Sequence, residues 1–241
     1  MEELGERELP KAVAVMSMPR LAFTDNMFSA MRSLIPLGIN LEKASGVFWG
    51  QMLTRLMEPH LTDGNEYIIT IDYDTYFTKN YVIKLLQLMR EYPEADAIVP
   101  LQIKRNSDMP MIGRKGDDQA MLTKIPVEDF QKELMPIVTG HFGLTIFRVE
   151  SLKKLKRPWF MPVPAPDGGW GNGRRDEDVF FWHNFADSGL NTFLAPGIGL
   201  PHLQMMATVP GRLADCLKPV HLYVQDLDQN GIPDWCEPKV N

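Results

Sequence analysis

The chain has 241 residues, of which 44% are hydrophobic and 23% charged, and its formal net charge is −6. This length is ample for one sizeable domain with a real core, and the acidic balance argues against a nucleic-acid partner, which favours a basic surface. No run approaches the roughly 18 apolar residues of a membrane span, and residues 1–8 lack the apolar core of a signal peptide. The two cysteines, Cys216 and Cys236, do not make a disulfide scaffold. We therefore expect a cytoplasmic protein without a transmembrane segment.

The first hundred residues alternate between predicted strands and predicted helices. Apolar and β-branched runs predict strands at residues 12–18, 39–41, 67–71 and 97–99. Helices are predicted to begin at Asp25, at Phe48, and at Thr78 or Asn80. The apolar stripes of the first and third helices are Met27, Ala30, Met31 and Leu34, and Val82, Leu85, Leu86 and Met89.

The second half begins without periodicity, so residues 106–129 are predicted to be an exposed connection. Residues 137–147 predict one long strand, in which glycines indicate points where another part of the chain approaches closely. A short helix is predicted at residues 149–155. A Pro/Gly loop at residues 162–173 precedes a helix that begins at Asp176, and the last strand is predicted at residues 192–195. Strands that alternate with helices predict an α/β fold with a mixed, mainly parallel sheet flanked by helices. Such sheets bind ligands at the carboxyl ends of their strands.

Asp72 and Asp74 directly follow the strand predicted at residues 67–71. Because side chains alternate along a strand, both carboxylates point to the same side where the strand leaves the core. Crowded carboxylates repel unless a cation lies between them, and Mg²⁺ or Mn²⁺ held by one or two carboxylates commonly completes its shell with substrate phosphates. The pattern therefore favours a divalent-metal site, with a capped turn as the structural alternative.

Several motifs follow one another in order over residues 12–202. They are the strand that ends at Met18-Pro19-Arg20, residues 69–74, residues 140–143, Pro158-Trp159-Phe160, the Glu177-Asp178 pair and His202. Their order and spacing resemble the GT-A class of nucleotide-sugar glycosyltransferases, particularly its family-2-like branch. The resemblance implies a Rossmann-like single domain with a donor-binding half at residues 1–105 and an acceptor half at residues 106–205. Residues 206–241 would form a C-terminal tail.

The resemblance also implies a metal centre and a catalytic base. Asp72 would face the ribose and the metal, whereas Asp74 and His202 would ligate Mn²⁺ or Mg²⁺. Asp178, with Glu177 as the alternative, would take the proton of the acceptor hydroxyl in an inverting transfer. The metal would neutralise charge on the departing diphosphate. The same two acids also suit a helix N-terminus, where carboxylates are favoured.

Nucleotide-binding residues are predicted by position in the resemblance. Pro19 and Arg20 stand where relatives contact the base and the phosphates. Gly46 and Gln51 match positions that precede the metal-binding strand, although many relatives have arginine where this chain has Gln51.

Acceptor-binding residues are predicted in the same way. Trp170, in a glycine-rich loop, resembles the tryptophan of a flexible acceptor loop and could stack on a sugar face, with an inward-packing tryptophan as the alternative. His141 is the second acceptor-binding candidate, although a histidine in an apolar strand is more often a hydrogen-bonded core residue.

The tail contains the residue spacing of an EF-hand calcium loop. Its oxygen ligands would come from Asp226, Asp228, Asn230, Asp234 and Glu237. Pro233 and Pro238 exclude a paired EF-hand, which leaves either a solitary Ca²⁺ loop or an acidic, turn-rich tail. Cys216 and Cys236 flank this segment and could bridge in an oxidising setting.

Taken together, these features predict a metal-dependent glycosyltransferase. It would use a nucleotide-diphosphate sugar and an acceptor hydroxyl on a glycan, a protein or a small molecule. One alternative is a nucleotidyltransferase on a related α/β sheet, which usually carries a Gly-rich basic loop that residues 16–20 lack. The other is a non-catalytic carbohydrate-binding or calcium-binding protein with the same fold.

Overall fold

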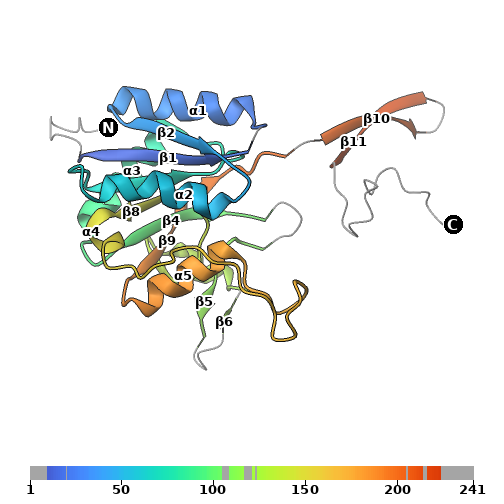
Figure 1. The fold of residues 1–241 in the computed structure, drawn as a ribbon. Helices are drawn as coiled ribbons and strands as arrows, with labels where there is room; N and C mark the ends of the chain where they lie inside the picture. Colours follow the sequence, from blue (N-terminus) through green and yellow to red (C-terminus); the bar gives the residue numbers. More distant parts are fainter. Residues whose placement is uncertain are drawn as a thin grey trace. The chain divides into compact units, whose positions relative to one another are not determined.

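The computed structural model describes residues 10–19, 21–104, 109–116, 121–122, 124–204, 206–213 and 216–223. The chain divides into two compact units, one that ends at His202 and one that begins at Leu203. The first unit is a mixed α/β sheet flanked by helices (Figure 1). This confirms the predicted fold class, whereas the division of this unit into donor and acceptor halves stays a prediction.

The sheet of the first unit has seven strands within the described residues, in the order β2-β1-β3-β8-β4-β9-β7. Five of them run in one direction, and β8 and β7 run against their neighbours. The sheet is therefore mixed and mainly parallel, as predicted. In chain order the strands are β1 (Ala12–Met18), β2 (Asn40–Ser45), β3 (Tyr67–Ile71), β4 (Ala97–Gln102), β7 (Met135–Ile137), β8 (Leu144–Arg148) and β9 (Thr192–Leu200).

Helices cover both faces of the sheet because successive strand side chains point to opposite faces. On β1, Val13 and Val15 belong to one core cluster and Ala14 and Met16 to the other. The first cluster packs against α2, α4 and α5, and the second packs against α1 and α3 (Figure 1). The helices are α1 (Thr24–Leu34), α2 (Trp49–Met57), α3 (Lys79–Glu91), α4 (Val149–Leu152) and α5 (Glu177–Asp187), with 3₁₀ turns η1 (Ile35–Leu37), η2 (Glu58–Leu61) and η3 (Val127–Gln131).

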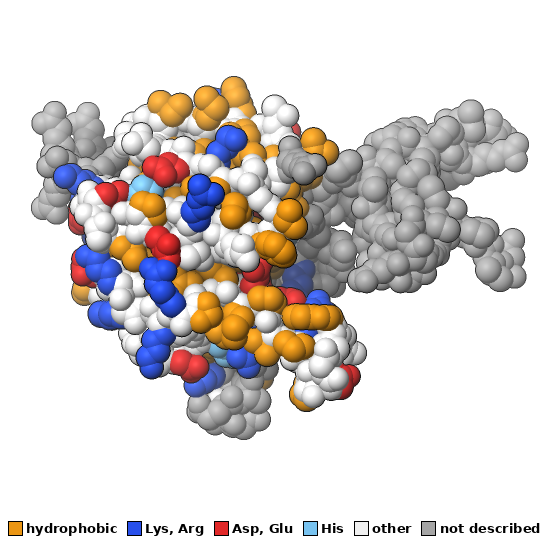
Figure 2. Space-filling view, in the orientation of Figure 1, with side chains coloured by type: hydrophobic (Ala, Val, Ile, Leu, Met, Phe, Trp, Pro, Cys, Tyr) orange, Lys and Arg blue, Asp and Glu red, His pale blue; other side chains and the backbone are white. Residues whose placement is uncertain are grey.

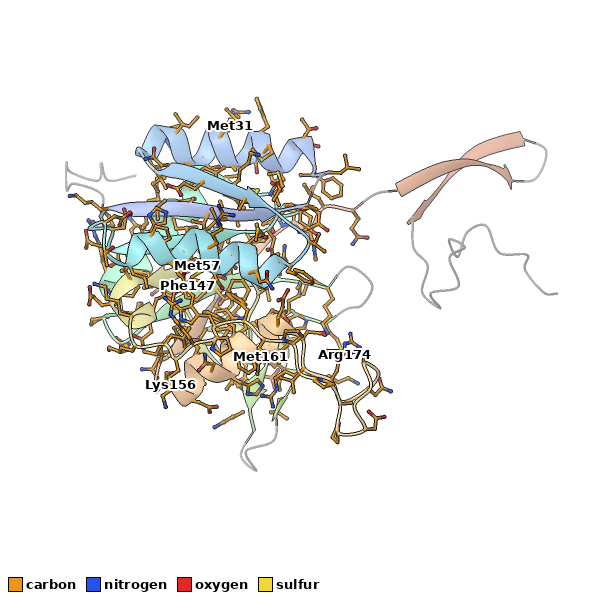
Figure 3. All side chains as sticks on the ribbon, in the orientation of Figure 1. Met31, Met57, Phe147, Lys156, Met161 and Arg174 are labelled. Atoms are coloured by element: carbon orange, nitrogen blue, oxygen red, sulfur yellow. The ribbon has the colours of Figure 1, made fainter. Side chains whose placement is uncertain are left out.

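The predicted stripe is correct for α3 and partly wrong for α1. In α3 all four predicted positions are buried. In α1 the helix begins at Thr24 without a side-chain cap, and Met31 is 49% exposed (Figure 3). The buried face consists instead of Asn26, Ser29, Ala30, Ser33 and Leu34. Small and hydrogen-bonding side chains face inward here because α1 contacts polar backbone around the loop after β3, as described below.

The single strand predicted at residues 137–147 is wrong. β7 ends at Ile137, β8 begins at Leu144, and the intervening residues turn, with Thr139 bridging to Gly113. A Cβ atom at Gly140 would lie 2.8 Å from Val99 Cγ2, so glycine permits a close approach rather than a continuous strand. The helix predicted at residues 149–155 is shorter in the structure, and the strand predicted at residues 192–195 extends to Leu200.

The connection predicted at residues 106–129 has structure of its own. Its described residues include a two-stranded ribbon, β5 (Arg114–Lys115) and β6 (Met121–Leu122), and Ile112 is only 4% exposed.

The second unit contains an antiparallel hairpin that the sequence did not predict. Its strands are β10 (Met206–Leu213) and β11 (Cys216–Tyr223), and Pro210 pairs with Pro219 in the ladder. Prolines weaken a strand pattern because they cannot donate a backbone hydrogen bond. The calcium-loop residues 226–237 and Cys236 lie outside the described residues, so the Ca²⁺ and disulfide predictions remain predictions. In the described part of the chain no helix is long and apolar enough to span a membrane.

Candidate active site

A cavity of about 550 Å³ lies at the carboxyl ends of the central strands. Its lining comes from the segments that follow β2, β3, β4 and β9, from the turn before β8, and from the loop and first turn of α5. The sequence-predicted site residues that it brings together are Asp72, Asp74, His141, Trp170, Glu177, Asp178 and His202. With Asp176, five carboxylates line this one cavity.

Asp74 and His202 form a direct pair in the cavity wall. His202 Nε2 lies 3.3 Å from Asp74 Oδ2, and Asp74 is only 4% exposed. The other ring nitrogen, His202 Nδ1, lies 3.1 Å from the carbonyl oxygen of Ile103 and donates to it. This bond sets the tautomer that leaves Nε2 facing the carboxylate. Metal-binding histidines commonly hold their second nitrogen in this way.

Backbone contacts bring these two residues together although they are far apart in the chain. Thr75 and His202 form an antiparallel bridge, and the Tyr76 N–H donates to the Pro201 carbonyl at 3.1 Å. The end of β9 is thereby joined to the loop after β3. The structure thus explains how a histidine after β9 reaches an aspartate after β3.

Asp72 lies beside this pair, is half-buried, and has a strongly shifted pKa. Burial, together with the neighbouring charges of Asp74 and Asp178, raises its pKa to about 7, against the opposing effect of His202. The indole of Trp49, the first residue of α2, donates a hydrogen bond to the Asp72 carboxylate. Several acids crowded in a buried space are electrostatically costly, and a bound cation would relieve the repulsion.

Glu177 and Asp178 occupy the first turn of α5, with Asp176 at the N-cap. The Gly50 N–H in α2 donates to Glu177 Oε1 at 3.2 Å. A Cβ atom at Gly50 would lie 2.5 Å from Glu177 Oε2 and 2.6 Å from Phe160 Cβ, so the close packing at this point favours glycine. Asp178 Oδ1 accepts from the adjacent Val179 N–H at 2.8 Å. Burial raises the pKa of both acids above the ordinary value. Glu177 therefore ties α5 to α2, and Asp178 is the acid without such an anchor to another element among the described contacts.

His141 lines the cavity but is held by the backbone on both sides of its ring. Nε2 donates to the Pro100 carbonyl at 2.8 Å, and Nδ1 accepts from the Gly143 N–H at 2.9 Å. Burial lowers its pKa to about 4, so the imidazole is neutral. These contacts describe a histidine that shapes the turn before β8. They give no support to its predicted role in acceptor binding.

Trp170 belongs to a loop that is closed at its base. Val163 and Arg175 exchange two backbone hydrogen bonds of 2.8 Å, and Gly168 and Gly173 have positive φ angles of 81° and 93°. Arg174 belongs to this loop (Figure 3). It pairs with Asp176 and also donates to the Trp170 carbonyl. The Trp170 side chain is 58% exposed and lines the cavity, so it does not pack inward.

Of the residues predicted to bind the nucleotide, Asp72 lines this cavity, whereas Pro19, Gly46 and Gln51 are not among its described lining. Pro19 is exposed directly after β1, and Gly46 lies after β2. Gln51 lines a separate cavity of about 590 Å³ together with Arg55 and Arg157. Arg20 lies outside the described residues.

Asn26 is a residue that sequence reasoning missed. It is fully buried in α1, and its Nδ2 donates to the carbonyls of Asp72 at 2.8 Å and Thr75 at 2.6 Å. It therefore clamps both ends of the four-residue segment that carries Asp72 and Asp74. The only sequence signal was a polar residue one position before the expected apolar stripe of α1.

The metal-binding side chains of this cavity suit a cation that a bound phosphate-containing molecule also helps to coordinate. Within the described residues no three His, Cys, Asp or Glu side chains form a ready metal-binding group. Asp74 and His202 supply two donors, with Asp72 beside them. Such a site fits Mn²⁺ or Mg²⁺ that completes its shell with phosphate oxygens and water.

The comparisons with known proteins support the fold. No family model and no curated protein sequence matches the chain. Among solved structures, "Crystal Structure of A197 from STIV" aligns with a TM-score of 0.51 and 13% identity, over 84% of this chain and 98% of that one. "Crystal structure of GalNAc-T7 with UDP, GalNAc and Mn2+" aligns with a TM-score of 0.54 and 10% identity, over 82% of this chain.

This chain spans 44% of the GalNAc-T7 chain, which is a GT-A glycosyltransferase. At such low identity the similarity concerns the fold alone. The first unit therefore has a GT-A-like fold.

Proposed function

We propose that this protein is a metal-dependent glycosyltransferase that transfers a sugar from a nucleotide-diphosphate sugar to an acceptor hydroxyl with inversion. The observation that carries the proposal is the meeting of Asp74, His202 and Asp178 in one cavity of a GT-A-like fold. These residues come from three distant parts of the chain. A purely structural role for each of them would not require that they meet.

The charge of the cavity supports the dependence on a metal. Five carboxylates line it, and no Lys or Arg belongs to its described lining. An anionic diphosphate would be repelled from such a surface unless a cation lay between them. Asp74 and His202 would hold the metal, and Asp72 would contribute beside them. The bound metal would supply Lewis-acid stabilisation of the departing diphosphate.

Asp178 is the residue proposed to take the acceptor proton. Its raised pKa makes it a stronger base than an ordinary aspartate, and it lines the cavity close enough to Asp72 to perturb it electrostatically. Glu177 positions the helix end through Gly50. We therefore assign the base to Asp178 and a positioning role to Glu177.

The test measures release of UDP from UDP-GalNAc in the presence of Mn²⁺ or EDTA, with other nucleotide sugars as further donors. We expect release only with the metal. Asp178→Asn should lower the rate roughly 100-fold or more while UDP binding is retained. Asp187→Asn, at the exposed opposite end of α5, is the matched control and should retain the wild-type rate. Equal loss in both variants would remove Asp178 from the mechanism.

A further inference from the structure

Exposed apolar side chains occur on, or directly beside, the segments that line the 550 Å³ cavity. Eleven large hydrophobic side chains are exposed in the described residues, and six of them belong to segments that border this cavity. Two of the six, Phe48 and Trp170, line the cavity itself and are 61% and 58% exposed. We call this group the apolar rim; its members are Val47, Phe48, Tyr76, Ile103, Met161 and Trp170.

The remaining four rim residues are tied to the cavity by chain position or hydrogen bonds. Val47 directly precedes Phe48 in the chain, and Met161 directly precedes Pro162. Both Phe48 and Pro162 line the cavity. The Tyr76 N–H donates to Pro201, next to His202, and the Ile103 carbonyl accepts from His202 itself.

The rim is built from separate segments of the first unit. Its members follow β2, β3 and β4 or lie in the segment that leads into α5. Figure 2 shows hydrophobic side chains on the surface over that last segment, and Figure 3 labels Met161 there. Because the rim residues come from several separate segments that line or adjoin the cavity, one poorly packed loop does not explain the rim.

The cavity combines polar groups with the apolar surface of the rim. Its lining includes five carboxylates, and one of them, Asp74, pairs with His202; these groups suit a metal, phosphates and hydroxyl groups. The rim offers apolar surface that is costly to leave in water and that marks binding sites when it is contiguous. A molecule that satisfies both regions has a polar end in the cavity and an apolar part at the mouth.

We propose that the acceptor is amphiphilic, with a hydroxyl-bearing sugar or similar polar group joined to an alkyl or aryl group that packs on the apolar rim. This inference rests on the proposed function and names the acceptor class for the same site. An unsubstituted soluble sugar would leave most of the rim exposed, so its binding would gain little from these side chains.

The test compares n-octyl β-glucopyranoside, below its micelle concentration, with methyl β-glucopyranoside. The two share one sugar and differ only in the apolar group. Isothermal titration calorimetry should show the octyl compound binding at least roughly tenfold more tightly, which is about 1.4 kcal/mol and less than the transfer free energy of two buried methylene groups.

Variants locate the effect on the rim. Phe48→Ser and Met161→Ser should each lower the octyl-to-methyl preference several-fold. Met161 is outside the cavity lining, so Met161→Ser should leave the weak binding of the methyl compound unchanged. Phe28→Ser is the matched control, because Phe28 is 60% exposed on α1 and lies outside the cavity lining. It should keep the full preference. All three positions are exposed, so folding, checked by thermal unfolding, should be preserved.

Three outcomes would overturn the inference. The first is octyl binding no tighter than methyl binding, or none at all. The second is an equal loss of preference in Phe28→Ser. The third is sedimentation with phosphatidylcholine vesicles that Met161→Ser abolishes, which would assign the rim to a membrane surface. Failure of UDP-GalNAc turnover with the octyl preference intact would count against the proposed function and leave the apolar site standing.

Discussion

Replacing Asn26 by leucine tests whether α1 positions the metal-binding segment. Leucine has the same number and branching of side-chain heavy atoms but removes both hydrogen bonds to the carbonyls of Asp72 and Thr75. The Asp72 carbonyl keeps a bond from the Thr75 N–H at 3.3 Å, so the main loss falls on the Thr75 carbonyl. A buried acceptor that loses its donor costs about 1–3 kcal/mol. The Oδ1 atom of Asn26, which is buried without a partner in the described structure, offsets part of that cost when it is removed.

We therefore expect a loss of about 2 kcal/mol in the free energy of unfolding, or about 4–8 °C in the melting temperature of a domain of this size. The larger effect should be on the metal. Mutating a group that orients metal ligands typically weakens metal binding about 10–100-fold. The Mn²⁺ concentration for half-maximal UDP release should rise by at least roughly tenfold.

Ser33→Ala is the matched control for Asn26→Leu. Ser33 lies on the same buried face of α1 and donates one hydrogen bond of 3.3 Å to the Phe77 carbonyl, outside the segment that carries Asp74. It should cost about 1 kcal/mol of stability without changing the Mn²⁺ requirement. An unchanged Mn²⁺ requirement in Asn26→Leu, or the same shift in both variants, would refute the positioning role.

The remaining predictions concern three other residues. Gly50→Ala places a methyl group 2.5 Å from Glu177 Oε2, so we expect a stability loss of about 1–3 kcal/mol from overpacking, measured by urea denaturation; wild-type stability would show that the contact between α2 and α5 is loose. His141 has a folded-state pKa of about 4, below its ordinary 6.5, so the fold favours the neutral ring. The stability that this provides is complete above pH 6.5 and is lost as the pH falls from 6.5 through 4, by about 3 kcal/mol in total. The free energy of unfolding of His141→Asn should therefore fall less over this range than that of the wild type. An equal or larger fall in the variant would contradict the assignment. Trp170→Ala should leave the melting temperature within about 1 °C of the wild-type value because the side chain is largely exposed. The KM for the acceptor should rise, whereas the KM for the donor should not. An unchanged acceptor KM would remove Trp170 from the acceptor site.

Regular periodicity made much of the fold predictable from sequence. The apolar runs of β1 and β3 and the stripe of α3 follow directly from side-chain alternation and helical spacing, and the structure places them as expected. The prediction failed where tertiary contacts override local pattern. Met31 continues the apolar stripe of α1 in sequence, yet Asn26 and Ser33 face inward because they meet backbone carbonyls there.

The candidate site shows the same division. Asp72 and Asp74 could be recognised because one short strand places them at a sheet edge. Asp74 and His202 are separated by most of the sequence of the first unit, so their pairing could be proposed only through the resemblance. The contact between Gly50 and Glu177 had no local signal, because the need for glycine comes from a distant helix end that approaches it.

The central claim is that a divalent cation at Asp74 and His202 binds a nucleoside diphosphate in this cavity. The most direct test is the affinity of the protein for UDP, measured by calorimetry in Mn²⁺ and in EDTA, for wild type and for Asp74→Asn. The account predicts binding that requires Mn²⁺ and weakens at least roughly tenfold in the variant. UDP binding of equal strength in EDTA, or binding that Asp74→Asn leaves unchanged, would contradict it.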